Sequence, residues 1–545
     1  MSSSPSTNAD TAEIFDVIIV GAGPCGLAIA ARLRERRPSA LFTDEEHARY
    51  SWMSRHANKA AIKIKRTGQV KTGSDCQPCQ YGPSILVLDE HGNDFLAKWK
   101  SFFRKLEIKN LRSPMFFHPD PSDRDALLAF CHEAGRSHEM EEIVGCVGKE
   151  VSKHKKKRRM NQRGGSTKSA VEVDERDRKD YFTPSSSCFE DFCEACISKY
   201  RLGDGLIQQG TVREIEYTMA PGDERPLFHI RTNTAQYLAR TVVLALGPGE
   251  PIIPSPFVPG QLPASATHVT DATLPKLLSK DLLSKIRCGK PTNVLIIGGG
   301  LTSAQAADLC IRRGVGKVYL LMRGHLKVKP FDVDLCWMSK FRNQQQSVFY
   351  TSDDFAERFE MIKEARGGGS MTSRASKLLK QYVQDSKVIM HTHTTVKTQC
   401  FEESSQCWTI ATEPPVADLP QFDHIFFATG TKTDVESMPM LQPLLANHPI
   451  KSIAGLPTLN EDLAWAEDVP LFFTGKLAML QLGPGAGNLE GARIAAERVS
   501  WAIEDVLKNS TDVKVDGEGQ RLWDSDEGYV SGIGSKFAGL SVDSE

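Results

Sequence analysis

Two glycine-rich turns constrain the fold of this chain more than any other feature. The first, Gly21-Ala-Gly23-Pro24-Cys-Gly26, follows an apolar run at residues 14–20, and the second, Gly298-Gly-Gly300-Leu-Thr-Ser303, follows residues 293–297. Each stands between a predicted strand and a predicted helix, the context that a dinucleotide-binding turn requires. Glycine lets main-chain amides approach a pyrophosphate at a helix N-terminus, whose dipole favours anions. The chain is therefore expected to bind two dinucleotides and to act as a hydride-handling oxidoreductase.

Length and composition favour a soluble protein of two or three domains. The 545 residues exceed what one core organises, and the formal net charge of −1 gives no basis for a nucleic-acid partner. No apolar run approaches the ~18 residues of a membrane span, and the Ser-rich start lacks the apolar core of a secretory signal. The thirteen cysteines have no regular spacing, which is typical of reduced thiols in a cytoplasmic protein.

The order of the predicted elements indicates an α/β fold in which a Rossmann-like FAD domain is interrupted by a Rossmann-like NADPH domain. After the second glycine unit, a strand at 470–474 and a helix at 489–506 return to elements of the first-domain type. Residues 66–111 read as loop-rich. The expected division is a disordered N-terminus (1–13), a first FAD part with a flexible basic insertion at 149–179 (14–290), an NAD(P)H domain (291–430), a returning FAD segment (431–507) and a tail (508–545).

The residues around the first turn favour FAD. Asp44, at the end of a predicted strand at 40–43, is the twenty-fourth residue counted from Gly21. A carboxylate near this spacing can accept hydrogen bonds from ribose hydroxyls and repels a 2′-phosphate. Pro24 is frequent in FAD-binding turns. Trp52 is a candidate wall for the flavin ring, although an ordinary core tryptophan explains it equally well.

The second turn favours NADPH over NADH. Gly298 and Gly300 take the first two glycine roles, and Ser303 stands where the third glycine is usual. The next predicted strand, 318–322, ends in Arg323, whose guanidinium can pair with a 2′-phosphate. Lys327 and Lys329 either reinforce this preference or belong to a solvated basic loop.

Two further turns follow predicted strands and carry a family resemblance. Ala245-Leu-Gly247 and Ala428-Thr-Gly430 let the backbone pass close to a cofactor. Together with the glycine turns, they resemble the two-dinucleotide-domain flavoproteins, and within them the single-component flavin monooxygenases. The stretch 423–430 is similar to a motif of the branch that N-hydroxylates ornithine or lysine, and 473–478 is similar to the oxidative-stress-induced growth inhibitor group. The chain departs from the N-hydroxylating pattern at Cys25 and Thr431, and at 264–270 it retains only His268 of the Baeyer–Villiger signature.

The resemblance implies an FAD- and NADPH-dependent monooxygenase acting on a small-molecule substrate and O2. NADPH reduces FAD, and the reduced flavin and O2 form a C4a-(hydro)peroxyflavin that oxygenates an amine or another soft nucleophile. Asn488, in the glycine-rich segment 482–491, precedes a helix whose N–H groups can stabilise charge on the flavin, or it belongs to a loop without cofactor contact. No catalytic side chain and no metal site is predicted, and self-association is left open.

Two other functions remain open from the sequence. The first is a reductase, either of the NADPH-oxidase type or a flavin-dependent dithiol or disulfide reductase, which would use Cys76 with Cys79 or Cys193 with Cys196. A flavin-binding regulatory protein would have no turnover.

Overall fold

The computed structural model describes residues 13–35, 61–63, 70–72, 82–147, 178, 180–203, 205–219, 225–338 and 342–510. The chain divides into two compact units, one of Met1–Leu41 with Pro83–Ser500 and one of Phe42–Gly82 with Trp501–Glu545. In the second unit, β2 (Ala61–Lys63) and β3 (Val70–Thr72) form an antiparallel pair. Both glycine turns belong to the first unit.

The first sheet is built around β1 (Ile14–Val20), whose residues Val17, Ile18 and Ile19 are fully buried. An apolar run of this kind suits a parallel strand covered on both faces. The sheet order is β22-β23-β10-β1-β4-β7, and β9 joins it beside β10. The other strands are β4 (Ile85–Asp89), β7 (Ile207–Gln209), β8 (Val212–Met219), β9 (Pro226–Thr232), β10 (Gln236–Leu244), β22 (Ala464–Ala466) and β23 (Val469–Phe473).

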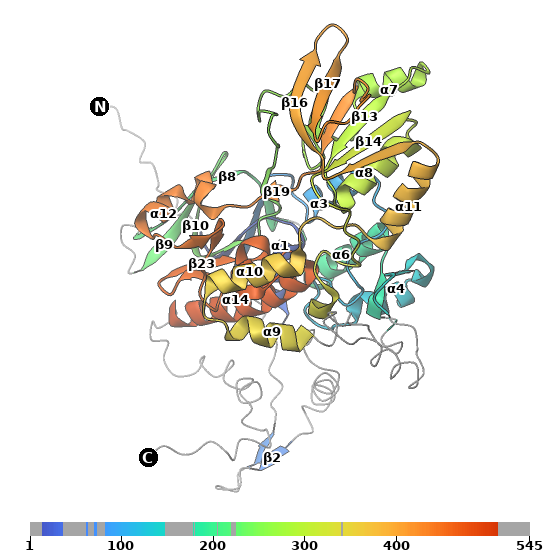
Figure 1. Cartoon of the computed structure of the whole chain (residues 1–545). Coiled ribbons are helices and arrows are strands. Elements are labelled where there is room, and N and C mark those ends of the chain that lie inside the picture. Colours follow the sequence, from blue (N-terminus) through green and yellow to red (C-terminus); the bar gives the residue numbers. More distant parts are fainter. Residues whose placement is uncertain are drawn as a thin grey trace, which may run out of the picture. The chain divides into compact units, whose positions relative to one another are not determined.

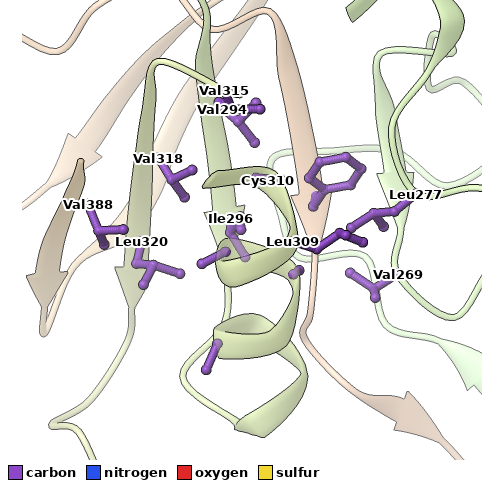
Figure 2. Packing of buried hydrophobic residues seen from close by; sticks show 14 of the residues in the cluster. Val269, Leu277, Val294, Ile296, Leu309, Cys310, Val315, Val318, Leu320 and Val388 are labelled. Atoms are coloured by element: carbon purple, nitrogen blue, oxygen red, sulfur yellow. The ribbon is translucent and has the colours of Figure 1, made fainter. Parts of the chain in front are cut away.

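The second sheet has five parallel strands in the order β12-β18-β13-β14-β15. These strands are β12 (Ala266–His268), β13 (Asn293–Ile297), β14 (Lys317–Met322), β15 (Val388–Thr392) and β18 (His424–Phe427). Helix α8 (Leu301–Arg312) packs on this sheet, with Leu309 and Cys310 against Val294, Ile296 and Leu320 (Figure 2). Helix α11 (Ser373–Gln384) lies beside α8 (Figure 1), and its Leu379 belongs to the same buried core.

The second sheet is inserted into the first, which confirms the predicted nested α/β architecture. Strand β23 comes after the whole second sheet in the chain, yet it pairs in parallel with β10 of the first sheet. A hairpin of β16 (Thr395–Glu402) and β17 (Cys407–Glu413) extends from the inserted part (Figure 1).

The remaining helices connect and cover these sheets (Figure 1). They are α1 (Pro24–Arg34), α3 (Ala97–Leu106), α4 (Ala126–Glu133), α6 (Ser186–Lys199), α7 (Lys280–Arg287), α9 (Arg342–Thr351), α10 (Phe355–Arg366), α12 (Gln442–Asn447), α13 (Met479–Leu482) and α14 (Leu489–Ser510). Short strand pairs are β5 (Glu141–Glu142) with β6 (Phe182–Thr183), β11 (Glu250–Pro251) with β19 (Thr431–Lys432), and β20 (Ser452–Ile453) with β21 (Leu456–Pro457). None of the helices in the described ranges is both long and apolar enough to cross a membrane.

The prediction that residues 66–111 are loop-rich is wrong for their second half. Strand β4 lies there and pairs directly with β1 in parallel, and helix α3 follows it. Strand β4 is the run Ile-Leu-Val-Leu-Asp, and its four apolar residues are buried. One of the two neighbours of β1 in the sheet, β4, therefore begins about fifty residues after α1 ends.

Candidate dinucleotide-binding sites

The first turn has a distinct structural requirement at each of its three glycines. Gly21 has φ +110°, and a Cβ there would stand 2.5 Å from the Ala245 carbonyl oxygen. A Cβ at Gly26 would stand 2.0 Å from the Gly21 carbonyl oxygen, so only glycine lets α1 lie this close to the turn. At Gly23 no atom lies within 4 Å of the Cβ position, which faces open space. This opening is where a pyrophosphate can approach the backbone.

The start of α1 suits an anion. Gly23 is the N-cap residue, no side chain caps the helix, and Pro24 occupies the first turn without an amide hydrogen. Helix N-termini leave amide hydrogens without intrahelical partners, and the helix dipole adds positive potential there. The turn therefore fits a pyrophosphate by shape and by charge.

Asp89 provides the carboxylate next to this turn. It is the last residue of β4, and its Oδ2 accepts a hydrogen bond of 2.8 Å from the Ala22 amide. Its Oδ1 accepts the His91 amide at 2.7 Å. An acidic residue at the tip of the strand beside β1 is the group that holds a ribose in this fold. Asp89 was not among the predicted residues, because a count of about twenty residues from Gly21 leads to Asp44, which lies outside the described residues. The apolar run ending in an acid at 85–89 was the available signal.

Further turns meet at the same edge of the first sheet. The Ala245 amide donates to Val20 at 2.9 Å, which brings the turn to Gly247 against the first glycine turn. After β23, the Cβ position of Gly475 lies 3.6 Å from the Cys25 sulfur. Burial raises the pKa of Cys25 to about 11, so this thiol stays protonated at neutral pH. In parallel sheets ligands bind at the carboxyl ends of the strands, which is where these turns gather.

The second turn repeats this construction. Gly298 has φ +146°, and its Cβ position is 2.3 Å from the Ala428 carbonyl oxygen. Gly300 is the N-cap of α8, without a side-chain cap, and its Cβ position meets only the Gly369 Cα, at 3.8 Å. Ser303, in the place of the third glycine, is fully buried and donates from Oγ to the Gly300 carbonyl at 2.6 Å. Serine is accommodated because its hydroxyl is used inside the turn.

A third glycine-rich segment, Gly367-Gly-Gly369, lies against the second turn. The Cβ position of Gly369 is 3.4 Å from the Gly300 Cα and 3.5 Å from its nitrogen. These are ordinary van der Waals distances, so the segment packs against the turn without overlap. Residues 367–369 were not predicted as part of a site, although three consecutive glycines are a visible signal in the sequence.

The basic residues after β14 have different surroundings. Arg323 is exposed directly after the strand, at the edge where the second turn lies. Lys327 instead donates to the Gly367 carbonyl, and Lys329 donates to the Ala365 carbonyl at 3.3 Å and pairs with Asp334 at 2.7 Å. Cations are favourable at a helix C-terminus, and these two lysines stabilise the end of α10. Arg323 is thus the exposed residue of the three, whereas both lysines are partly buried against α10.

Gly430, a predicted site residue, and His268 lie at or just after the ends of two strands of the second sheet. Gly430 follows β18 with φ +83°, and Ile252 donates its amide to the Gly430 carbonyl at 3.0 Å. His268 ends β12, and its Nδ1 lies 2.6 Å from Thr270 Oγ1. Burial lowers the pKa of His268 to about 4, so the ring is neutral at physiological pH.

Asn488 lies in a polar contact between the inserted part and the returning segment. Its Nδ2 donates to Asp332 Oδ1 at 3.0 Å, and Asp332 also pairs with Arg366 at 3.0 Å. Nearby, Glu490 in the first turn of α14 is buried and accepts Arg342 at 3.0 Å. Burial raises the pKa of Glu490 to about 6, against the opposing effect of Arg342. Trp337 and Glu490 line a small cavity together with Gln346, Leu482, Pro484, Gly485, Gly491 and Ile494.

Some predicted residues lie outside the described part of the chain. These are Asp44, Trp52, Cys76, Cys79 and, apart from Arg178, the basic insertion predicted at 149–179. The other C-x-x-C pair, Cys193 and Cys196, is buried on α6, and burial raises the pKa of both thiols. Within the described residues, no group of His, Cys, Asp or Glu is arranged to hold a metal ion.

No protein-family model matches the chain, and no curated protein sequence matches it significantly. Solved structures do match. The reduced ornithine hydroxylase of Pseudomonas aeruginosa has a TM-score of 0.57 at 17% identity, over 91% of this chain and 100% of that one. The ornithine N-hydroxylase of Kutzneria sp. 744, with reduced FAD, NADP+ and L-ornithine, has a TM-score of 0.58 at 15% identity, over 90% and 99%. The FAD-bound cadaverine monooxygenase of Erwinia amylovora has a TM-score of 0.57 at 14% identity, over 90% and 95%.

These comparisons define the class of fold. The chain has the two-domain α/β fold of the flavin-dependent N-hydroxylating monooxygenases, which confirms the resemblance seen in the sequence. At these identities the likeness concerns the fold.

Proposed function

We propose that this protein is an FAD- and NADPH-dependent oxidoreductase that monooxygenates a small-molecule amine or another soft nucleophile. The observation that carries the proposal is that the glycine turn occurs twice. In each turn, the Cβ position of one glycine lies against a carbonyl oxygen, and another glycine is the N-cap of a helix that no side chain caps. Such a turn accepts a pyrophosphate, and two of them accept two dinucleotides. The shared fold with FAD-bound amine monooxygenases supports the same assignment.

The first site would hold FAD. Gly23 and the start of α1 would bind the pyrophosphate, and Asp89 would accept hydrogen bonds from the adenosine ribose. When bound, the flavin supplies hydride acceptance from a nicotinamide and activation of O2. Gly247 follows β10 without a neighbour within 4 Å of its Cβ position, so the backbone there leaves room for the cofactor.

The second site would hold NADPH. Gly300 and the start of α8 would bind the pyrophosphate, and Arg323 would pair with the 2′-phosphate. The hydroxyl of Ser303 keeps the turn in the conformation that presents the Gly300 amide. The protein would thereby orient the nicotinamide, the flavin and the substrate while excluding water.

The functional experiment measures product as well as NADPH consumption. The purified protein, supplied with FAD, is incubated with NADPH, O2 and a panel of primary amines, thiols and ketones, and products are identified by mass spectrometry. The proposal expects a substrate that gains one oxygen atom in step with NADPH oxidation. NADPH oxidation that yields only hydrogen peroxide with every amine and thiol would contradict the monooxygenase assignment.

A dithiol reductase is less well supported by the described site. Cys193 and Cys196 are both buried within α6, and burial keeps their thiols protonated. A reductase needs an accessible thiolate next to the flavin. The monooxygenase therefore remains the single proposed function.

A further inference from the structure

Two cysteines far apart in the sequence are in direct contact. Cys131 lies on α4 and Cys188 lies on α6, 57 residues further along the chain, and their sulfur atoms are 2.9 Å apart. Both side chains are buried, at 0% and 1% exposure. A disulfide bond is about 2.05 Å long, so the two sulfurs are within about 0.9 Å of bonding distance.

The position of Cys188 favours the thiolate. It lies in the first turn of α6, and its amide donates to the N-cap side chain of Ser185 at 3.0 Å. A helix N-terminus stabilises a thiolate. The hydrogen bond from Cys131 lowers the pKa of Cys188, and the positive charge of Arg136 acts in the same direction, whereas the pKa of Cys131 is raised. Cys188 is therefore expected to react first with an oxidant, and Cys131 is expected to react with the oxidised Cys188.

Arg136 is fixed beside this pair. Its guanidinium donates to Ser187 Oγ at 2.7 Å and to Glu139 Oε2 at 2.8 Å, and it also pairs with Asp191. Ser187 and His132, the neighbours of the two cysteines in sequence, are exposed, whereas Cys131 and Cys188 themselves are buried. A small neutral oxidant would therefore reach the pair through local opening of α4 and α6.

We propose that Cys131 and Cys188 form a redox-active dithiol that hydrogen peroxide converts reversibly into a disulfide. The Cys188 thiolate attacks one peroxide oxygen, the O–O bond breaks, and hydroxide leaves and takes up the thiol proton as water. Cys188 is then a sulfenic acid. The Cys131 sulfur attacks it, the S–O bond breaks, and a second water leaves. Two thiols lose two electrons and two protons, and one peroxide becomes two waters.

The disulfide would link α4 covalently to α6. It closes a chain loop of 57 residues, and cross-links that close long loops restrict the unfolded chain most. We therefore expect the oxidised protein to unfold at a higher temperature than the reduced protein. This inference is independent of the proposed monooxygenase activity, since the peroxide is added in the test.

The test uses the full-length protein, reduced, freed of reductant and treated with hydrogen peroxide. After alkylation in denaturant and proteolysis, mass spectrometry should find a peptide containing Cys131 linked to one containing Cys188, lighter by two hydrogen atoms. Of the thirteen cysteines, two fewer should be alkylated, and dithiothreitol should restore both. Both cysteines remaining alkylatable, or Cys188 linked to another cysteine instead, would overturn the proposal.

Variants separate the paired mechanism from general oxidation. With Cys131→Ala, the sulfenic acid of Cys188 should persist and be trapped by dimedone, and the peroxide-dependent rise in Tm should disappear. Cys310→Ala is the matched control, because Cys310 is equally buried and its pKa is raised to about 12 by burial. It should retain both the linked peptide and the rise in Tm. Should Cys131→Ala not fold, the peptide mapping of the unmodified chain still decides the question.

Discussion

Gly26, in the first turn of α1, lies directly against the carbonyl oxygen of Gly21. A Cβ at Gly26 would stand 2.0 Å from that oxygen, whereas a Cβ at Gly23 would meet no atom within 4 Å. The two glycines therefore have different tasks within one short turn. Gly26 permits the helix to pack on the turn, and Gly23 keeps space open for a ligand.

This difference predicts opposite outcomes for two alanine substitutions. Gly23→Ala should leave the free energy of unfolding nearly unchanged, since φ −75° and ψ −173° suit alanine, but should weaken FAD binding. Gly26→Ala should destabilise the protein by about 2 kcal/mol or more, because the methyl group overlaps backbone. Urea unfolding and FAD titration measure the two effects. A stable Gly23→Ala variant with unchanged FAD affinity would show that no cofactor approaches there.

The ribose-binding carboxylate is expected to be Asp89. Asp89→Asn removes the charge while leaving an oxygen for the Ala22 amide, so FAD affinity should fall by about tenfold or more, as charged hydrogen bonds contribute roughly 1.5–3 kcal/mol. Asp44→Asn is the matched comparison, because Asp44 was predicted for the same role from its spacing. Loss of affinity in the Asp44 variant alone would return the role to that residue.

Arg323 should decide between NADPH and NADH. Arg323→Gln removes the guanidinium without disturbing a described contact, and we expect KM for NADPH to rise about tenfold or more while KM for NADH changes little. Steady-state cofactor oxidation measures both constants. Lys327→Gln is the control, because this lysine binds the end of α10 and should not alter the preference. An equal change with both cofactors would contradict a 2′-phosphate contact.

Buried histidines should make the fold sensitive to acid. Burial lowers the pKa of His424 to about 3, so between pH 6.5 and about 3 the unfolded chain binds a proton that the folded chain does not. Stability is therefore lost as pH falls through this window, by about 1.4 kcal/mol per pH unit for each such histidine. His118 and His268 act in the same direction.

Replacing His424 isolates one of these contributions. His424→Gln should reduce the slope of the unfolding free energy against pH by about 1.4 kcal/mol per pH unit between pH 4.5 and 6, which is the contribution of one proton. This change in slope is expected whatever the stability of the variant at pH 7. Urea unfolding at several pH values measures this slope. An unchanged slope would mean that His424 is protonated in the folded state.

The sequence was sufficient to predict the two turns and the nested fold, because these depend on local patterns. Apolar runs such as Ile14–Val20 and Asn293–Ile297 form the strands next to each turn, and the glycine spacing fixes the helix that follows. The insertion was also predictable, since strand β23 and helix α14 continue the first domain after the second turn unit.

Other features depended on how distant parts of the chain come together. Asp89 was not predicted, because residues 35–84 separate α1 from β4 and a count from Gly21 leads to Asp44, even though the run at 85–89 has the pattern of a strand. The sequence did not distinguish the roles of Lys327 and Lys329 from that of Arg323, because the hydrogen bonds of the two lysines to the end of α10 form only in the folded chain. The contact between Cys131 and Cys188 joins two helices that only the packed structure brings together.

The most direct test of the two-site assignment is an anaerobic NADPH titration of the purified protein, supplied with FAD and freed of unbound flavin. The visible absorbance of retained flavin should disappear after one equivalent of NADPH per flavin, because both dinucleotides bind to one chain. A protein that retains no flavin, or whose flavin keeps its absorbance with excess NADPH, would contradict it.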